Sequence, residues 1–429
     1  MKKDESDYVD VNQLQIGMFV ELGVGWMAHP FPVGSFKISS EKQIETIRSL
    51  GLTRVRYVPE KSDPVHFVAD PSVGQPAVPV VSERAAQALR DEATRMRRAQ
   101  LLGAQQRSLA ACERRFGEAA RQYRQTLDQL HAQPRAAADQ CQAMIAGFVG
   151  EMTADGESAI RLLTEAAGEK SSMHSVNVTI VSLLLGKAMG MHANDLIDMG
   201  VAAFLHDIGK TELPDRVRWF EENFSTAEYK LYQEHVALGV QIGVSMGLSR
   251  GAMLTMSQHH ELADGSGFPA RIKGASMTAG ARILALVNRY DNLCNPSRPA
   301  LAMTPHEALS LMFAQLKTRF DSVTLSAFIR MMGVYPPGSV VQLIDDRFAI
   351  VVSVNSSRPL KPKVIIHEPG VSKHEALILD LEHASNVGIR RSVKPANLPS
   401  AALDYLAPRQ RISYFFERSG DSQMQELFA

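Results

Sequence analysis

Residues 203–210 read Ala-Phe-Leu-His-Asp-Ile-Gly-Lys, and this stretch decides the fold that we expect. An apolar stripe runs through it at intervals of three or four residues: Ile197, Val201, Phe204 and Ile208. This spacing predicts a buried helix that ends in the adjacent pair His206 and Asp207. Neighbouring side chains on a helix diverge by about 100°, so the pair cannot grip one ion as two histidines four apart would. It can place two ligands at the rim of one site, with the aspartate free to bridge two metal ions.

Other histidines and an aspartate elsewhere in the sequence indicate that this pair belongs to a metal site. Taken alone, an adjacent His-Asp pair more often marks ordinary polar residues at a helix end. Here, five of the 13 histidines join two aspartates in one candidate set that spans residues 174–291: His174, His206, Asp207, His235, His259, His260 and Asp291. Neutral imidazoles and carboxylates suit iron, manganese, zinc and nickel, and none of the three cysteines lies among them. The sequence therefore predicts a metal site built from nitrogen and oxygen ligands.

Composition limits the class of protein. A chain of 429 residues with 45% apolar residues is long enough for two to four domains with real cores. Lys and Arg equal Asp and Glu at 46 each, so no global charge favours a nucleic acid polymer or an anionic membrane. The cysteines lie far apart, without the spacing of a disulfide framework. With no apolar signal segment and no apolar run of membrane-spanning length, we expect a cytoplasmic protein without a membrane span.

The N-terminal part is expected to form a small α+β module over residues 7–68. Its short strands are predicted at 9–11, 18–22 and 55–58, and a helix capped by Ser39 or Ser40 runs to Leu50. Three aromatic residues are expected to pack this module, with a ligand role left open: Trp26, Phe31 and Phe36. Residues 69–81 are rich in proline and glycine and predict a linker.

An arginine-rich helical connector is expected over residues 82–150. A long helix is predicted at 82–131, broken at Pro134, with a second helix at 136–149 and a third at 158–168. The surplus of arginines could bind an acidic partner. A solvated helix or a coiled coil that forms a homodimer is the interpretation we favour.

Residues 151–335 are expected to be helical and to form the domain that carries the predicted metal site. Its helices are predicted to begin at caps provided by Asn194 or Asp195, and by Ser225, Ser249, Thr278 and Thr304. The remaining residues, 336–429, turn to a β pattern with strands near 339–344, 348–354, 363–367 and 376–379. The fold class is therefore mainly α: a helical bundle with a small α+β N-terminal module, a long linker helix and a β-rich C-terminal appendage.

The ordered motifs His, HDIGK, EHxxxG, HHExxDGSGFP and a late Asp resemble those of the HD-GYP family, a subset of the HD-domain metal-dependent phosphohydrolases. The resemblance covers residues 155–335. Residues 7–68 resemble the small module of unknown function that often precedes this domain, and the β tail led by Tyr-Pro-Pro-Gly is similar to one that often follows it. The resemblance implies an HD-type helical bundle.

The activity implied by the resemblance is hydrolysis of the bacterial messenger cyclic di-GMP to pGpG, and in many members on to GMP. The seven histidines and aspartates named above match the family's metal ligands, with Asp207 bridging two divalent ions. Iron or manganese is expected first, with nickel or zinc left open. Lys210 matches a lysine that contacts the scissile phosphate or aids the leaving group, so Asp207 and Lys210 are the expected catalytic residues. Paired metals suit this reaction because they neutralise phosphate charge and lower the pKa of water.

The loop that names the family corresponds to residues 264–269. The resemblance implies that it borders the site and contacts GGDEF-domain proteins, and its glycines allow close backbone approach to a ligand. We expect substrate contacts from Asp264, Gly265, Ser266 and Gly267, together with Lys210.

Three departures from the family pattern change these expectations. Lys170 stands where some members carry a glutamate that binds a third metal, so a two-metal site is expected. Phe268 replaces the signature tyrosine. The stretch 295–301 keeps one arginine of the family's basic group, and we expect Arg282 and Arg298 to compensate.

Two alternatives remain beside the active phosphodiesterase. The chain could be a receptor for cyclic di-GMP or pGpG that turns over little and signals through its terminal modules. It could also hydrolyse another nucleotide phosphate, although the 264–269 loop argues against this. The seven ligand positions favour an enzyme, because a receptor would not need them all, whereas the altered basic stretch favours a receptor.

Overall fold

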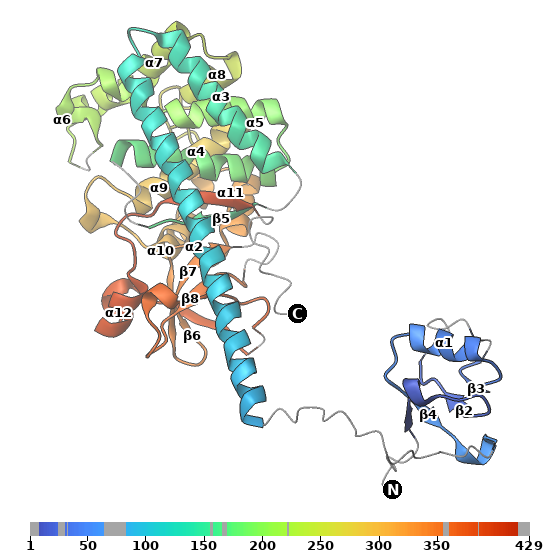
Figure 1. Cartoon of the computed structure of the whole chain (residues 1–429). Helices are drawn as coiled ribbons and strands as arrows, with labels where there is room; N and C mark the ends of the chain where they lie inside the picture. Colours follow the sequence, from blue (N-terminus) through green and yellow to red (C-terminus); the bar gives the residue numbers. More distant parts are fainter. Residues whose placement is uncertain are drawn as a thin grey trace. The chain divides into compact units, whose positions relative to one another are not determined.

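The computed structural model describes residues 8–24, 31, 33–63, 83–154, 158–164, 170–220, 223–354, 360–384 and 386–418. The chain forms two compact units, Met1–Gln87 and Ala88–Ala429, and each is considered by itself (Figure 1). The chain is mainly helical, with a small N-terminal sheet and a β-rich C-terminal region, as predicted. The expected linker 69–81 and the aromatic residue Trp26 lie outside the described residues.

The first unit is the predicted α+β module. Its sheet has the antiparallel order β1-β4-β2-β3 and packs with one helix: β1 (Tyr8–Asp10), β2 (Phe19–Glu21), β3 (Ser35–Lys37), β4 (Arg54–Tyr57) and α1 (Glu41–Ser49). Met18, Val20 and Ile47 are fully buried in its core. The predicted strands and helix are confirmed, with Ser40 as the N-cap. Strand β3 was not predicted, because its three residues contain a single apolar side chain.

The predicted long helix is α2 (Glu83–Gln129), and Pro134 begins the next helix, α3 (Pro134–Thr153), at its first turn. From residue 88 to 100 α2 is exposed, whereas from Leu101 onward one face is buried. Phe116 is fully buried, and the Tyr123 ring meets Phe204 edge-on, with 5.3 Å between ring centroids. The interpretation of α2 as a solvated helix therefore fails over its second half, because that half belongs to the core of the second unit.

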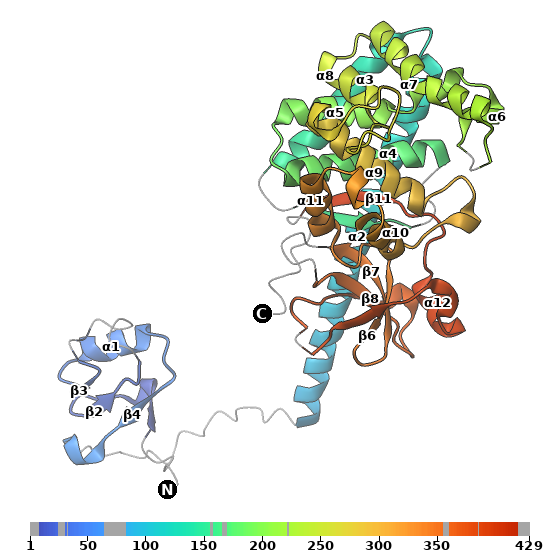
Figure 2. The same ribbon diagram turned by 180° about the vertical axis from the view of Figure 1, so that it is seen from behind.

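The helical part of the second unit surrounds α4, as Figure 2 shows from behind. The elements that build it are α4 (Lys170–Ala188), α5 (Ala193–Leu205), η4 (Ile208–Glu212), α6 (Asp215–Arg218), α7 (Thr226–Met246), α8 (Arg250–Ser257), α9 (Ala279–Cys294), α10 (Pro305–Ala314) and α11 (Ser322–Met332). Helix α4 contacts α5, α9 and α11. Val178, Ile180 and Leu185 are fully buried on different sides of α4, which explains its nearly continuous apolar sequence.

Most predicted helix starts are confirmed. The caps Ser225, Ser249, Thr278 and Thr304 each accept a hydrogen bond from a backbone N–H three residues on, and Ser225 and Thr304 form complete capping boxes. The caps expected at Asn194 or Asp195 are wrong. Helix α5 begins earlier, with His192 as its N-cap, and no side chain at this cap accepts a hydrogen bond from the helix backbone.

The helix predicted at 158–168 is also wrong, because residues 158–162 form a strand. This strand belongs to an antiparallel sheet of order β10-β6-β7-β5-β11, with β8 pairing with both β7 and β9. The members are β5 (Ser158–Leu162), β6 (Val340–Leu343), β7 (Phe348–Val354), β8 (Lys363–Ile366), β9 (Ile378–Asp380), β10 (Ile389–Ser392) and β11 (Tyr414–Arg418). A short helix, α12 (Ser400–Leu406), precedes β11. Residues on the two sides of position 335 thus share one sheet, and the domain boundaries remain a prediction.

Candidate metal centre

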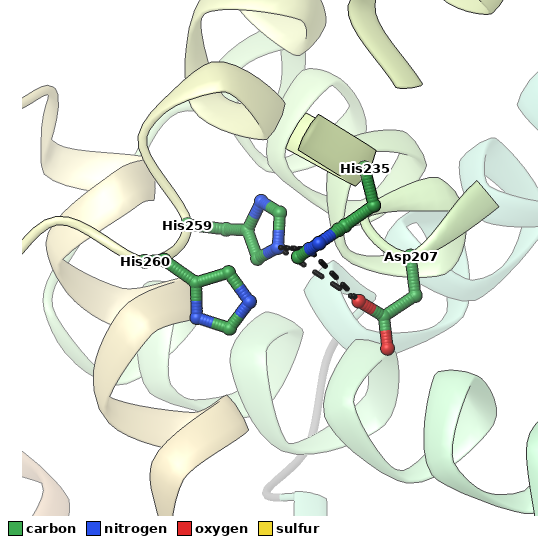
Figure 3. A group of neighbouring side chains, drawn as sticks. All are labelled: Asp207, His235, His259 and His260. Atoms are coloured by element: carbon green, nitrogen blue, oxygen red, sulfur yellow. Dashed lines mark hydrogen bonds and ion pairs between the residues drawn. The ribbon is translucent and has the colours of Figure 1, made fainter. Parts of the chain in front are cut away.

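Four helices deliver six of the seven predicted ligands to one place. His174 lies in the first turns of α4, and His206 and Asp207 follow directly after α5. His235 lies on α7, and His259 and His260 follow α8. Figure 3 shows Asp207 facing His235, with His259 and His260 beside them. Except for His174 and His260, which are slightly exposed, the rings and the carboxylate are buried. The geometry therefore brings together six of the seven predicted ligands around a single carboxylate.

These six residues form two sets that share Asp207, and the ligand atoms of each set lie within 4.8 Å of one another. One set is His174, His206 and Asp207, and the other is Asp207, His235, His259 and His260. Asp207 Oδ2 lies 3.7 Å from His174 Nε2 and 3.5 Å from His206 Nε2. Its other oxygen, Oδ1, lies 3.7 Å from His235 Nε2 and 3.8 Å from His259 Nε2. Each carboxylate oxygen thus serves one set, as a bridging ligand would.

Backbone hydrogen bonds fix the ring orientation of three histidines. His206, His235 and His259 each donate from Nδ1 to the carbonyl oxygen three residues earlier, on Ala203, Tyr232 and Met256. The Nδ1 atom therefore carries the ring proton, and the Nε2 lone pair points into the centre. This is the tautomer that metal-binding histidines need.

Burial keeps these rings neutral. It lowers the pKa of His206 to about 4 and the pKa of His235 and His259 to about 3. Burial also lowers the pKa of His260 well below its ordinary value. At neutral pH these side chains present lone pairs rather than N–H groups, so no proton has to leave before a cation binds.

The donor set fits a divalent metal ion. His235 Nε2 and His259 Nε2 lie 3.3 Å apart, and with both protons on Nδ1 two lone pairs face each other without a hydrogen between them. Among the described residues, Asp207 Oδ1 and His260 Nε2 are buried without a hydrogen-bond partner. Buried polar atoms of this kind are costly unless something satisfies them. A cation among these atoms would satisfy all of them.

Asp291 takes a different place from the other predicted ligands. Within the described residues it joins neither set, and its Oδ2 lies 2.6 Å from His174 Nδ1. Its Oδ1 accepts hydrogen bonds from Asn177 (3.0 Å) and Asn295 (2.9 Å). In this geometry Asp291 orients His174, in the way that carboxylates orient metal-bound histidines. Its assignment as a direct ligand remains a prediction.

Sequence reasoning missed the two asparagines. Asn177 also donates to the Ile412 carbonyl (2.7 Å) and accepts from the Tyr414 N–H (2.9 Å), so it ties Asp291 to strand β11. Asn295 exchanges hydrogen bonds with the Ile412 backbone. The available signal was spacing, because Asn177 follows His174 by three residues and Asn295 follows Asp291 by four, which places each pair on one helix face.

Lys210 lies beside Asp207, and its catalytic role remains a prediction. Its Nζ is 2.6 Å from Asp207 Oδ2 and lies over the rings of Trp219 (5.8 Å) and Tyr232 (5.3 Å). Burial alone would raise the pKa of Asp207, but His206 and Lys210 outweigh it and hold that pKa well below its ordinary value. Burial likewise opposes the charge of Lys210, and Asp207 outweighs it and raises the pKa of Lys210. Both groups are therefore charged at neutral pH.

The loop after His260 is held by a buried glutamate that we had not singled out. The Glu261 carboxylate accepts from the backbone N–H groups of Ala270 (2.6 Å), Arg271 (3.0 Å) and Ile272 (3.1 Å). Asp264 accepts from the Ser266 N–H and hydroxyl, which shapes the turn. Gly265 has φ +81, and a Cβ on Gly267 would lie 2.4 Å from the Leu262 nitrogen. The two glycines are therefore required by the loop itself.

Phe268, Arg282 and Arg298, the other residues singled out from the family pattern, have different surroundings. Phe268 stacks on the His260 ring, with 4.4 Å between centroids, so the ring that replaces the signature tyrosine packs against the metal centre. Arg282 lies in the first turns of α9 and acts electrostatically on Asp321. Arg298 is exposed at the start of a short 3-10 turn. Their roles in substrate binding remain predictions, and the side chain of Lys170 lies outside the described residues.

Comparisons with known proteins agree with this centre. Residues 158–323 match the HD domain family, and residues 8–141 match a domain of unknown function, DUF3391. The chain is 27% identical over 373 residues to the cyclic di-GMP phosphodiesterase PA4108 of Pseudomonas aeruginosa, covering 85% of this chain and 86% of that protein. It is 22% identical to the cyclic di-GMP phosphodiesterase PdeB of Borreliella burgdorferi, covering 51% of this chain and 59% of that protein. It is also 26% identical to the 3'3'-cGAMP-specific phosphodiesterase 3 of Vibrio cholerae, covering 42% of this chain and 39% of that protein.

Among the helices that the structure describes, none combines the length and apolarity needed to cross a bilayer. The DUF3391 match reaches residue 141, so it includes helix α2 as well as the small sheet. With the ordered motifs, the shared aspartate and these matches, the chain carries an HD domain preceded by a DUF3391 module, and it is similar to cyclic dinucleotide phosphodiesterases.

Proposed function

We propose that this protein is a metal-dependent phosphodiesterase that hydrolyses cyclic di-GMP to pGpG, with further hydrolysis to GMP left open. One observation carries the proposal: two sets of ligand atoms share Asp207, and neutral imidazole nitrogens face each other 3.3 Å apart within one of them. The relatives named above act on cyclic dinucleotides, which gives the substrate class.

Two divalent ions, iron or manganese before nickel or zinc, would be held on the two sides of Asp207. His174 and His206 would hold one, supported by Asp291, and His235, His259 and His260 would hold the other. When bound, such ions neutralise charge on phosphate oxygens and lower the pKa of water, so that a nucleophile forms at neutral pH.

The protein's own residues supply the rest of the chemistry. Lys210, kept protonated by Asp207, can turn its ammonium group from that carboxylate to a phosphate oxygen or to the departing ribose oxygen, where negative charge develops. Glu261 fixes the loop whose backbone borders the centre. The buried histidines stay neutral, so they do not add positive charge that would weaken cation binding.

An aromatic surface next to Lys210 is proposed to bind a guanine base. Trp219, Phe220 and Tyr229 are 37%, 45% and 37% exposed, although large aromatic side chains are usually covered. The Phe220 and Tyr229 rings lie 5.9 Å apart, and Lys210 Nζ lies over the Trp219 ring. Stacking on such a surface contributes about 1–3 kcal/mol per base. This surface would position the dinucleotide while its phosphate meets Lys210.

Two alternative functions are distinguished by the same experiment. A relative specific for 3'3'-cGAMP makes that dinucleotide the second candidate substrate. The other is the receptor that binds cyclic di-GMP with little turnover, since the stretch after Asp291 keeps only one arginine of the family's basic group, the exposed Arg298. A contact with GGDEF-domain proteins through the 264–269 loop would fit either function.

The experiment uses the full chain, purified and loaded with Mn²⁺ or Fe²⁺ under anaerobic conditions. Cyclic di-GMP and 3'3'-cGAMP are supplied separately, and products are separated by chromatography. We expect pGpG to appear with wild type and with the control Asp195→Asn, an exposed acid on α5, and turnover to fall at least 100-fold in Asp207→Asn. Equal turnover in Asp207→Asn and wild type refutes the proposal. Tight binding of cyclic di-GMP without product supports the receptor instead.

A further inference from the structure

A second cavity lies in the same unit, away from the metal centre. It has a volume of about 340 Å³, within the range of sites for small organic ligands. Helix α2 forms one wall, and strands β8 and β9 form the other. Figure 1 shows α2 running along these C-terminal elements. None of the metal-centre residues lines this cavity.

Hydrogen bonds from side chains on α2 join the two walls and hold them in place. Gln105 on α2 donates to the Ala376 carbonyl (3.0 Å) and accepts from the Ile378 N–H (3.0 Å), on the two sides of one residue. Arg98 donates to the Glu375 carbonyl at 2.9 Å. These bonds hold α2 against the segment that leads into β9, and leave the space between them open.

The lining has an apolar body. Leu101 and Ala104 from α2 face Ile366 and Leu379 from the strands, and the Tyr405 ring closes one side. Leu101 and Ile366 are almost fully buried. An apolar surface of this kind favours an aliphatic or aromatic portion of a ligand.

One buried cation of the lining is poorly satisfied. Arg161 on β5 is 4% exposed, and its Nε has no hydrogen-bond partner among the described residues. Within the part of the chain that the structure describes, its one ion pair runs from a terminal guanidinium nitrogen to Glu417 Oε2 and spans 4.0 Å, which is longer than a hydrogen bond. A buried guanidinium with so few partners is costly, since its charge has lost water without gaining acceptors.

The other charges of the lining balance one another. Arg98, Arg347 and Lys363 also line the cavity, against the carboxylates of Glu368, Asp380 and Glu417, with His383 beside Asp380. Two pairs within the lining are long, 3.5 Å for Arg347–Glu368 and 3.9 Å for Lys363–Asp380, whereas Arg347 pairs closely with Asp345 outside the lining, at 2.7 Å. Because Asp345 neutralises Arg347, the lining has no excess charge, and the buried Arg161 is the group left to attract an anion.

We propose that this cavity binds a small amphipathic acid, with its carboxylate on Arg161 and its apolar portion against α2. The proposal does not rest on the phosphodiesterase activity. It assigns the α2 wall a ligand-binding role that neither the HD domain nor its metal centre requires.

The test uses the full chain and two probes, decanoate and the neutral 1-decanol, which share the apolar body. Binding is measured by displacement of the fluorescent sulfonate 8-anilinonaphthalene-1-sulfonate and by calorimetry. We expect decanoate to bind at least tenfold more tightly than decanol, because a charged hydrogen bond to Arg161 adds to the apolar contact. Arg161→Met should remove that difference.

Two tryptophan substitutions on α2 locate the site and keep the test independent of Arg161. Ala104→Trp fills the cavity and should abolish decanoate binding, whereas Ala99→Trp, on an exposed face of the same helix, should leave it unchanged. Circular dichroism and the melting temperature confirm that each variant folds. Equal binding of decanoate and decanol, or unchanged decanoate binding in Ala104→Trp, would overturn the proposal.

Discussion

Two facing glycines set how closely the aspartate and the histidine of the centre approach. Gly209 lies in η4, two residues after Asp207, and Gly239 lies on α7, four residues after His235. A Cβ built on Gly209 would lie 2.1 Å from the His235 carbonyl oxygen and 2.4 Å from the Gly239 nitrogen, both backbone atoms. A Cβ built on Gly239 would meet Gly209 and Ile208 at 3.5–3.8 Å, which is ordinary contact. The two substitutions by alanine should therefore differ sharply.

Gly209→Ala requires η4 and α7 to separate by about 1 Å, since backbone atoms cannot turn aside as a side chain can. Overpacking of this kind costs about 3 kcal/mol or more of unfolding free energy. It also moves Asp207 away from His235; Asp207 Oδ1 and His235 Nε2 now lie 3.7 Å apart. Distances from ligand atoms to a bound metal must stay within about 0.2 Å of their ordinary values. Gly239→Ala should be neutral or stabilise the protein by up to about 1 kcal/mol, because alanine favours a helix interior.

The assay combines urea unfolding of the metal-free proteins with metal content after dialysis, measured by mass spectrometry. We expect Gly209→Ala to lose at least one metal equivalent and to unfold at lower urea, while Gly239→Ala matches or exceeds wild type in both. The reasoning is refuted if Gly209→Ala keeps the stability and metal content of wild type, or if Gly239→Ala is the more damaged of the two.

Three further predictions follow from the same contacts. Asn177→Leu removes a hydrogen bond to Asp291, so metal affinity, measured with a competing chelator, should fall about 10- to 100-fold. Unchanged affinity would show that Asp291 does not need this hydrogen bond. Lys210→Met should lower kcat for cyclic di-GMP while metal content stays at the wild-type level, and loss of metal instead would make the lysine structural. The free energy of unfolding of the metal-free protein should decrease as pH falls from 6.5 towards 4, by up to about 1.4 kcal/mol per pH unit for each buried histidine. The reason is that histidines of the unfolded chain bind protons in this range, whereas the folded rings, with pKa values of about 3 to 4, stay neutral. A flat pH profile of urea unfolding over this window would contradict the assigned burial.

Local chemistry explains what the sequence could predict. Capping at Ser225, Ser249 and Thr278 depends on residues a few positions apart, so the helix starts follow from the sequence alone. The buried faces of α4 and α5 follow from their apolar spacing. The ordered histidines and aspartates likewise indicated one metal centre, because each stands at a helix end or on a buried helix face.

What the sequence could not show depends on partners far along the chain. Strand β5 pairs with β11, so that Leu162 lies opposite Tyr414, more than 250 residues away. Its short apolar run fits a helix or a strand equally well until that partner is known. Ile412, two residues before β11, supplies the backbone carbonyl that binds Asn177 and Asn295. The place of Asp291 behind His174 therefore depends on a contact that no local pattern encodes.

The buried half of α2 illustrates a second limit. Its sequence is rich in arginine and alanine, which is typical of a solvated helix, yet Arg115 lies over the Phe416 ring at 4.4 Å and pairs with Glu151. Long arginine stems can cover apolar surface while their charged ends find partners. Counting charges along the helix therefore exaggerates its exposure.

The central claim is that Asp207 lies between two metal ions. Anomalous diffraction from crystals grown with Mn²⁺ tests it most directly. The account predicts two peaks on opposite sides of the Asp207 carboxylate, one beside His174 and His206 and the other among His235, His259 and His260. Peaks located away from this carboxylate, or the absence of any peak in protein that has been supplied with excess metal, would contradict the account.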